Sequence, residues 1–487
     1  MKNLQDILYK VGMLETHGST NIDISEVVFD SREVVDSCLF VATKGLKADG
    51  HLFIEGALQS GALAILCEDL PENIQAGITY IQVKDSHEAL GLVASNYFGN
   101  PSKELKLVGI TGTNGKTTTT TLLHDLVLNL GYSAGLISTV VNKIEKEEIP
   151  ATHTTPNPIA LNALLRDMVD AGCEFCFMEV SSHAIHQNRI AGLDFDIAVF
   201  SNITHDHLDY HNTFKEYIQA KKKFFDDLSS DAIAITNIDD ANGGVMVQNT
   251  KAKVKTLALK TIADYKAKVL ESSFSGLVLN INNQDVWTNL IGGFNAYNIL
   301  TVFAIASELK LDEVEILTAI SKLKSVEGRF EYMKSEHNII AIVDYAHTPD
   351  ALKNVLSTIQ SVRTRNEQVL TVVGCGGDRD KTKRPLMAAI AAEFSDKVIL
   401  TSDNPRSEDP DTIITEMKAG VPADKSARTM AITSREEAIK VACTLAEAGD
   451  IVLVAGKGHE KYQEIKGERF PFDDLETLKQ TLKNLNK

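Results

Sequence analysis

The sequence has no long hydrophobic run. None of its apolar stretches reaches the roughly 18 residues that a membrane-spanning helix needs. The first residues, MKNLQDILYKVGML, are charged and lack the continuous apolar core of a secretory signal. We therefore expect a cytoplasmic protein that does not insert into a membrane.

Positive charge and cysteine are also scarce. Lysine and arginine number 49 against 66 acidic residues, which gives a formal net charge of −17. A surface of that sign repels nucleic acids and anionic membranes, so we expect neither as a partner. The six cysteines are scattered, and Cys173 and Cys176 form a lone CxxC. This pair could serve redox or metal chemistry, but two thiols on a buried strand are the favoured interpretation.

The chain contains no internal repeat and no low-complexity segment. Of its 487 residues, 44% are hydrophobic, which is enough for several cores. At roughly 100–200 residues per domain, this length favours three domains. The pattern changes sharply after Pro101 and breaks again near 325–330. We therefore predict domains at 1–100, 101–328 and 329–487.

Apolar runs typical of buried strands alternate with helical stretches. The runs LKLVGIT, FCFMEVSS and FDIAVFSNIT are separated by segments such as PIALNALLRDMVDAG, and the pattern restarts after residue 330. This alternation predicts an α/β fold with mostly parallel sheets. Many of the runs end in unusual polar motifs. Ligands of such sheets bind outside the carboxyl ends of the strands, so these motifs are the candidate sites.

A glycine-rich loop lies between a predicted strand and a predicted helix, in the segment GITGTNGKT at 109–117. Backbone N–H groups of such a loop surround phosphate oxygens, and the helix N-terminus adds positive potential. Lys116 would reach the β- and γ-phosphates, and Thr117 would hold Mg²⁺. The strict pattern requires glycine at position 110, where this chain has Ile110. The alternative is an ordinary glycine-rich turn.

The roles of three further polar groups are not decided by the sequence pattern alone. Glu179 ends an apolar run and suits a Mg²⁺ ligand, or else a salt bridge. The histidine-rich segment 205–211 fits no common zinc spacing, so it either donates one histidine to a metal or consists of surface histidines. Lys221, Lys222 and Lys223, taken alone, indicate a solvated basic helix face.

Taken together, the motifs resemble one family. In chain order they are GITGTNGKTT, EVSSH, NITHDHLDYH, QAKKKFF, GGFNAYN, EGRFE, DYAHTPD, GCGGDRDKTKRP, DNPR and AGKGHE. This set is similar to the Mur ligases of peptidoglycan synthesis, and the resemblance covers about residues 28–474. It implies an ATP-dependent, ADP-forming amide ligase. Its domains would be an N-terminal α/β domain that binds UDP, a central P-loop ATPase-like domain and a C-terminal Rossmann-like domain.

The resemblance also implies the site residues. ATP contacts would be Gly112, Thr113, Asn114, Gly115, Lys116, Thr117, Thr118, Asn295, Asn298, Arg329, Asp344 and His347. Contacts to a UDP-N-acetylmuramoyl dipeptide would be Ser31, Thr154, Thr155, Ser181, Gln187 and Arg189, although Ser31 could equally belong to a capped turn. Two Mg²⁺ ions would be held by Thr117, Glu179, His207 and Lys221. Lys221 matches a lysine that the family carbamylates with CO₂, which reverses the interpretation as a solvated face. The catalytic group would comprise Lys116, Glu179, His207 and Lys221.

The incoming amino acid would bind to the third domain. The implied contacts are Arg379, Asp403, Asn404, Pro405, Arg406, Gly456 and Glu460. Arg406 could pair with the distal carboxylate of meso-diaminopimelate, which lysine lacks, although a surface salt bridge is the alternative. Offering lysine would leave this arginine unpaired, at a cost on the order of 2–4 kcal/mol. We expect a monomer that acts on small molecules.

Two other functions remain open from the sequence. One is a related ligase with another acceptor, such as a folate polyglutamylating enzyme, although the leading domain and the DNPR tetrad argue against it. The other is a P-loop switch that binds partners rather than forming amide bonds. A ligase needs both the nucleotide-sugar and the amino acid to release ADP, whereas a switch needs neither.

Overall fold

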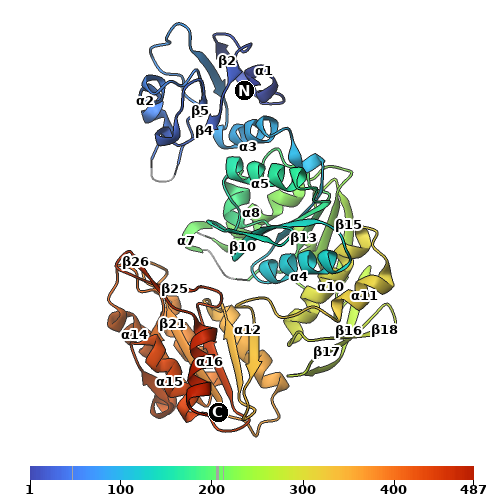
Figure 1. The fold of residues 1–487 in the computed structure, drawn as a ribbon, viewed down its shortest axis with the longest axis vertical. Helices are drawn as coiled ribbons and strands as arrows, with labels where there is room; N and C mark the ends of the chain where they lie inside the picture. The colour runs from blue at the N-terminus through green and yellow to red at the C-terminus, as the bar shows by residue number, and fades with distance from the viewer. Residues whose placement is uncertain (46–47, 205–207, 212) are drawn as a thin grey trace. The chain divides into compact units, whose positions relative to one another are not determined.

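The computed structural model describes residues 1–45, 48–204, 208–211 and 213–487 (Figure 1). The chain divides into two compact units. Unit 1 comprises Met1–Gly112, Leu123–Asn202 and Lys215–Thr256, and unit 2 comprises Thr113–Leu122, Ile203–Phe214 and Leu257–Lys487. Each unit is described by itself.

The N-terminal part of unit 1 contains a sheet of strand order β2-β7-β6-β5-β4. The strands are β2 (Met13–His17), β4 (Val27–Val28), β5 (Leu39–Val41), β6 (Ala64–Cys67) and β7 (Thr79–Val83), and the helices are α1 (Leu4–Ile7), α2 (Ile54–Gln59) and α3 (Ser86–Tyr97). Alternate residues of β5 face opposite sides, as the two-residue period of a strand requires. Leu39 and Val41 pack in the core with α1 and α3, and Phe40 packs with α2.

The second sheet of unit 1 has a parallel centre, β9-β12-β8-β13-β14, with β10 and β11 antiparallel at its edge. Its strands are β8 (Lys106–Thr111), β9 (Ala134–Ile137), β10 (Val141–Ile144), β11 (Glu147–Pro150), β12 (Phe175–Glu179), β13 (Ile197–Phe200) and β14 (Ile233–Asn237). The connecting helices include α4 (Lys116–Asn129), α5 (Pro158–Asp170), α6 (Ser182–His186) and α8 (Phe214–Asp226). The central strands are apolar throughout because both faces of a parallel sheet are buried.

Unit 2 begins its long C-terminal part with an antiparallel meander. The meander consists of β16 (Tyr265–Ser273), β17 (Gly276–Ile281) and β18 (Gln284–Thr288), and the end of β15 (Lys253–Ala258) pairs with β16 in parallel. Asn282 and Asn283 both have positive φ, which suits the two-residue turn between β17 and β18. The helices α10 (Gly293–Glu308) and α11 (Glu313–Ile320) come next.

The last sheet of unit 2 has the order β19-β20-β24-β21-β22-β23 and is parallel except for β19. Its strands are β19 (Glu331–Lys334), β20 (Ile340–Asp344), β21 (Val369–Cys375), β22 (Lys397–Ser402), β23 (Thr429–Ala431) and β24 (Ile451–Ala455). Helices cover both faces (Figure 1). One core holds α12 (Pro349–Val362), α13 (Lys383–Phe394) and α14 (Pro410–Lys418), and the other holds α15 (Arg435–Leu445) and α16 (Asp474–Asn484). Within β24, Leu453 joins the first core and Val452 and Val454 join the second.

The smaller elements complete the described chain. They are β1 (Lys2–Asn3), β3 (Asp23–Ile24), η1 (Ser31–Glu33), η2 (Gly50–Phe53), η3 (Pro101–Lys103), α7 (Leu208–His211), α9 (Gly243–Met246), η4 (Ala423–Arg428), β25 (Tyr462–Ile465) and β26 (Glu468–Pro471). Across the residues described, no helix is both long enough and apolar enough to span a bilayer. The α/β class with mostly parallel sheets is confirmed.

The CxxC pair lies on the buried segment that the sequence favoured. Cys176 is a residue of β12, and Cys173 precedes that strand. Both thiols are buried and unbridged in the described chain, and burial raises the pKa of each. The interpretation as buried thiols is confirmed, although only Cys176 lies on the strand itself.

Candidate functional site

The phosphate loop lies between β8 and α4, as predicted. Gly112 and Gly115 both have positive φ, at 152° and 90°. A Cβ on Gly112 would lie 2.0 Å from the Ser201 Oγ, and a Cβ on Gly115 would lie 2.6 Å from the Asn298 Oδ1. A larger residue at either position would therefore force the neighbouring side chain to move. Ile110, where the strict motif has glycine, is a fully buried residue within β8, so it stands outside the turn itself.

The side chains at the start of α4 contact residues from elsewhere in unit 2. Lys116 folds back and donates from Nζ to the Thr113 carbonyl at 2.9 Å. Arg329 donates from Nη2 to the Thr117 hydroxyl at 3.1 Å. The neighbouring Thr118 is buried. A cationic side chain thus lies directly beside the threonine that is predicted to hold Mg²⁺.

Asn114 and Thr204 meet at one carboxylate of α12. Asn114 Nδ2 and Thr204 Oγ1 donate to the Asp350 Oδ2 at 3.3 Å and 3.0 Å. Thr204 N also donates to Thr113 Oγ1 at 3.0 Å. Within unit 2, therefore, the phosphate loop is attached to the helix that follows the DYAHTPD motif.

The three consecutive lysines of α8 have different environments. Lys221 is 1% exposed, and its Nζ donates to the Gly112 carbonyl at 3.0 Å and to Thr111 Oγ1 at 3.3 Å. Lys222 is buried against Asp226, and Lys223 is half exposed. The solvated-face interpretation is therefore wrong for the first two lysines. Lys221 is the one that reaches the phosphate loop.

Glu179, at the end of β12, is buried and lies at the centre of a hydrogen-bond network. Its Oε1 accepts from the Thr139 backbone N–H at 2.7 Å, and its Oε2 accepts from the Thr139 hydroxyl at 3.2 Å. That hydroxyl also lies 3.0 Å from the hydroxyl of Thr154. The Thr155 hydroxyl donates to the Glu179 carbonyl at 2.7 Å. Among the residues described, these hydrogen bonds rather than a salt bridge satisfy the buried carboxylate.

The other predicted dipeptide contacts of this region extend the same network. Thr155 Oγ1 accepts from the Ser181 N–H at 3.1 Å, and the Thr155 carbonyl accepts from Arg189 Nη1 at 2.8 Å. Arg189 also donates from Nε and Nη2 to Gln187 Oε1, at 3.0 Å and 2.7 Å. The Ser181 hydroxyl caps α6. The structure thus brings together five of the six predicted dipeptide residues.

The sixth, Ser31, lies in the N-terminal part of unit 1. It begins η1, whose N-cap is Asp30. The Arg32 guanidinium holds the pKa of the Asp30 carboxyl at about 2. Because the Asp30 side chain also accepts from the Arg32 N–H, a capped turn is present here, and Ser31 lies within it.

Asn295 and Asn298 are buried on α10 and are hydrogen-bonded to each other. Asn298 Nδ2 donates to Asn295 Oδ1 at 2.9 Å, and Asn295 Nδ2 donates to the Ile291 carbonyl at 2.8 Å. The Asn298 oxygen lies against Gly115 and accepts from Thr119 Oγ1 at 3.4 Å. Asn298 therefore packs against the phosphate loop at Gly115, and Asn295 holds Asn298 in place.

Arg329, Asp344 and His347 cluster around Tyr345. The Arg329 guanidinium lies 4.7 Å from the centre of the Tyr345 ring, and the His347 ring lies 4.6 Å from it. Asp344 Oδ2 accepts from the Phe330 N–H at 2.6 Å. Burial raises the pKa of Asp344 to about 6, although Arg329 opposes the shift. Burial in this part of unit 2 therefore favours the protonated form of Asp344 more than water would.

The DNPR tetrad and the AGKGHE segment meet at the carboxyl ends of β22 and β24. Asn404 donates from Nδ2 to Glu460 Oε2 at 2.7 Å. A Cβ on Gly456 would lie 2.6 Å from the Asp403 Oδ2. These predicted amino-acid contacts therefore lie together.

Arg406 extends across the neighbouring loop. Its Nη1 donates to the Gly377 carbonyl at 2.8 Å, and its Nε lies 3.6 Å from Glu464 Oε2. A Cβ on Gly377 would lie 2.0 Å from the Pro405 carbonyl oxygen, which shows how closely the two loops pack. Arg379, in the same glycine-rich loop as Gly377, is exposed. The tetrad thus places a guanidinium beside the GGDRD loop, with one weak ion pair.

His207 lies outside the described residues. Within the described ranges, no group of three or more His, Cys, Asp or Glu side chains is arranged to hold a metal.

The sequence analysis missed several fully buried charges of the last sheet. Arg435 pairs with Asp474 at 2.7 Å, and Arg384 pairs with Glu408 and Glu416 at 2.8 Å and 2.6 Å. Lys457 is fully buried as well. Such charges give no local pattern, because their partners are distant in sequence. Lys457 and Arg384 did have a signal, since each lies inside a motif already singled out, AGKGHE and GCGGDRDKTKRP.

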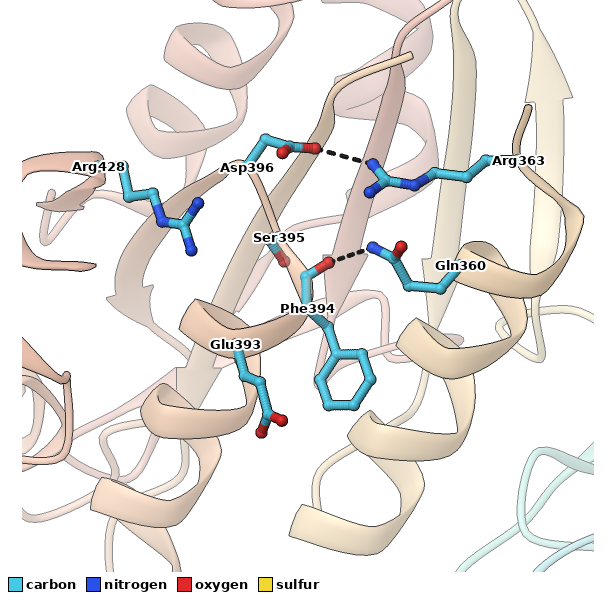
Figure 2. A pocket seen from close by; sticks show the side chains of 7 residues that line it. All are labelled: Gln360, Arg363, Glu393, Phe394, Ser395, Asp396 and Arg428. Carbon is cyan, nitrogen blue, oxygen red and sulfur yellow. Dashed lines mark hydrogen bonds and ion pairs between the residues drawn. The ribbon is translucent and has the colours of Figure 1, made fainter. Parts of the chain in front are cut away.

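A pocket of about 330 Å³ lies elsewhere in unit 2 (Figure 2). It is lined by Gln360, Arg363, Glu393, Phe394, Ser395, Asp396 and Arg428, which gather where α12 and α13 end. Figure 2 shows Arg363 paired with Asp396, and Gln360 bonded to the Phe394 carbonyl. None of its lining residues was predicted as a site residue.

Comparisons with known proteins cover nearly the whole chain. Family models match at residues 23–98 (Mur ligase family, catalytic domain), 110–306 (Mur ligase middle domain) and 328–458 (Mur ligase, glutamate ligase domain). The UDP-N-acetylmuramoyl-L-alanyl-D-glutamate–2,6-diaminopimelate ligase of Cytophaga hutchinsonii is 55% identical over 99% of this chain and 100% of that protein. The ligase of the same name from Bacteroides thetaiotaomicron is 53% identical over 98% and 99%. A solved structure of such a ligase has 33% identity and a TM-score of 0.72, and covers 100% of this chain and 99% of that one.

Proposed function

Because the chain belongs to the Mur ligase family, we propose that it joins meso-2,6-diaminopimelate to the D-glutamyl carboxylate of UDP-N-acetylmuramoyl-L-alanyl-D-glutamate, with ATP as the energy source. The observation that carries the proposal is identity above half over nearly the full length of relatives that bear this ligase name. A Glu460 carboxylate near the DNPR loop, with the Arg406 guanidinium on that loop, supports it, because an amino-acid head carries one charge of each sign.

The first step is phosphoryl transfer. The γ-phosphoryl group of ATP moves to the D-glutamyl carboxylate, giving an acyl-phosphate and ADP. Such a transfer needs mainly positioning and charge neutralisation. The phosphate loop, with Lys116 at the start of α4, is the candidate for both tasks. Asn298 supports the loop at Gly115, and Arg329 bonds to Thr117.

Two Mg²⁺ ions would neutralise phosphate charge when bound. Oxygen donors suit this ion, and Thr117, Glu179, His207 and a carbamate on Lys221 are the proposed ligands. The buried Glu179 and the Lys221 amine beside the Gly112 carbonyl fit this assignment. Neutral Lys221 would add CO₂, forming an N–C bond and releasing one proton. The carbamate nitrogen would keep one N–H, which could still donate to the Gly112 carbonyl, while its oxygens would serve as metal ligands.

In the second step the amino group of diaminopimelate attacks the acyl carbon. A tetrahedral intermediate collapses to the amide and releases inorganic phosphate. Glu460 would hold the ammonium of the distal amino-acid head, and Arg406 would pair with the carboxylate of that head, which lysine lacks. The other amino group attacks as the neutral amine and releases a proton to solvent when the amide forms. Water must be kept from the acyl-phosphate until the amine arrives.

An omission assay tests the proposal. ADP release is measured with MgATP, with each of the other two substrates left out in turn. A ligase releases ADP at full rate only when the nucleotide-sugar and diaminopimelate are both present. A nucleotide switch hydrolyses ATP regardless, and a folate-type ligase responds to neither substrate. ATP hydrolysis without the two substrates, or no response to either of them, would contradict the proposed ligase activity.

The carbamate has its own test. Lys221→Ala should lower activity by about 10²-fold or more, the scale expected when one preorganised electrostatic group is lost. Short carboxylates added to the buffer should restore part of that activity. Lys223→Ala, one of the same lysine run but half exposed, is the matched control and should behave as wild type. Full activity of Lys221→Ala without additives would refute the carbamate.

We further propose that the protein works as a monomer in the cytoplasm, with functional domains at 1–100, 101–328 and 329–487. Three family models match in succession, at 23–98, 110–306 and 328–458, which supports a division into three domains.

A further inference from the structure

Lys457 is a buried charge to which the proposed mechanism gives no role. It follows β24 in the AGKGHE segment and is 0% exposed. Its Nζ donates to Asn404 Oδ1 at 3.0 Å and lies 3.1 Å from Glu460 Oε2. The Tyr462 ring lies 5.4 Å away. A buried ammonium is costly unless it is paired and hydrogen-bonded, so this position is built around the charge.

The contacts of Lys457 join two loops. Asn404 Oδ1 accepts from Lys457 and also from the Glu464 N–H at 2.9 Å, while Asn404 Nδ2 donates to Glu460 Oε2. Arg406 N–H in turn donates to the Glu464 carbonyl at 3.0 Å. One ammonium therefore connects the loop that carries Glu460 with the loop that carries Arg406.

The same contacts restrain one oxygen of the Glu460 carboxylate. Oε2 is held by two donors, Lys457 and Asn404, so Oε1 is the oxygen that this arrangement presents to a ligand. The Glu460 side chain is 17% exposed, so it reaches the surface while Lys457 does not. Two donors on one oxygen restrict rotation of the carboxylate more than a single donor does.

We propose that Lys457 is a positioning residue for the amino-acid substrate. It fixes the orientation of Glu460 and the spacing between Glu460 and the Arg406 loop, which bind the substrate's ammonium and carboxylate groups. The inference rests on the proposed function.

The sign of the effect distinguishes this role from a simple charge effect. Loss of the Lys457 charge alone would strengthen the attraction of a substrate ammonium to Glu460 and lower the KM. Loss of positioning would instead raise the KM, because the substrate is then held in the wrong place. A misplacement on the order of 1 Å can cost about 10²-fold in rate. A change in the measured KM for diaminopimelate therefore distinguishes a positioning role of Lys457 from a pure charge effect: a rise indicates positioning and a fall indicates charge.

The test is Lys457→Met, which keeps the length of the side chain and removes the charge. The KM for meso-diaminopimelate should rise by about tenfold or more, while the KM values for ATP and the nucleotide-sugar change by less than about twofold. Lys440→Met is the matched control, since Lys440 also pairs with glutamates, at 2.8 Å and 3.0 Å, but on the surface of α15. It should leave all three values unchanged.

An unchanged or lower KM for diaminopimelate in folded Lys457→Met overturns the inference. If circular dichroism shows that this variant is unfolded, Lys457→Gln takes its place under the same criterion, because its amide can still donate to Asn404. A wild-type protein that does not use diaminopimelate would overturn the proposed function instead, so the two failures are distinguishable.

Discussion

At the scale of single residues, we propose that the choice of amino-acid substrate depends on Arg406. Its backbone is left-handed, with φ of 52°, and its guanidinium is held by the Gly377 carbonyl and weakly by Glu464. The Glu464 pair, at 3.6 Å between Nε and Oε2, is looser than a bidentate pair would be. A substrate carboxylate can therefore compete for this guanidinium.

Arg406→Ala should reduce the preference for diaminopimelate over L-lysine by about 10²-fold, since a polar group that recognises the distal carboxylate is lost. The measurement is kcat/KM for each amino acid. Arg365→Ala is the control, because Arg365 is also an arginine with positive φ, at 72°, on an exposed loop. An unchanged preference in Arg406→Ala would remove Arg406 from the specificity argument.

His459, the neighbour of Gly458, gives stability a pH dependence. Burial and nearby cations lower its pKa to about 3, from an ordinary value of 6.5. Its Nδ1 is buried and has no hydrogen-bond partner among the described residues. The folded protein keeps this ring neutral while the unfolded chain takes up a proton. Its contribution to stability is thus complete above pH 6.5 and is lost progressively between pH 6.5 and about 3.

At pH 5.5 this proton uptake should cost the wild type about 1.4 kcal/mol of unfolding free energy relative to pH 7.5. His459→Asn removes the titrating ring, so its melting temperature should fall less between the two pH values. Comparing the change with pH in each protein cancels the other titrating groups. Equal changes in both proteins would show that His459 is protonated in the fold.

At the scale of elements, the loop between β8 and α4 depends on space as well as on φ. Gly115 and Gly131 have nearly the same φ, 90° and 89°. An added Cβ would lie 2.6 Å from Asn298 Oδ1 at Gly115, whereas at Gly131 no described heavy atom lies within 4 Å. Substituting each glycine therefore distinguishes two effects. A substitution at Gly131 introduces backbone strain alone, whereas one at Gly115 also displaces Asn298.

Both Gly115→Ala and Gly131→Ala should lose about 1 kcal/mol of stability or slightly more, because each places a Cβ in a left-handed conformation. Only Gly115→Ala should also raise the KM for ATP, by about tenfold, because Asn298 must move away from the loop. Thermal melts and ATP titrations measure the two effects. A KM for ATP that stays at the wild-type value in Gly115→Ala would mean that Asn298 does not set the loop.

At the scale of the whole molecule, the sequence predicts the succession of strands and helices and the fold class well. It predicts the contacts between distant side chains poorly. The strand and helix alternation follows from local apolar periods, and the phosphate loop follows from its glycines and its place between β8 and α4. Lys221 was ambiguous because α8 carries three lysines in a row, and only the fold places one of them against Gly112. Buried pairs such as Arg435–Asp474 join residues far apart in the chain, so no local pattern could have predicted them.

The acyl-phosphate is the central claim about the molecule, and isotope transfer tests it most directly. The nucleotide-sugar is prepared with ¹⁸O in both oxygens of the D-glutamyl carboxylate and incubated with MgATP and diaminopimelate. Mass spectrometry then follows the released inorganic phosphate and the peptide product. We predict one ¹⁸O atom in each phosphate for every amide formed, because the bridging carboxylate oxygen leaves with the phosphoryl group. Amide formation with unlabelled phosphate, or no amide at all, would contradict the account.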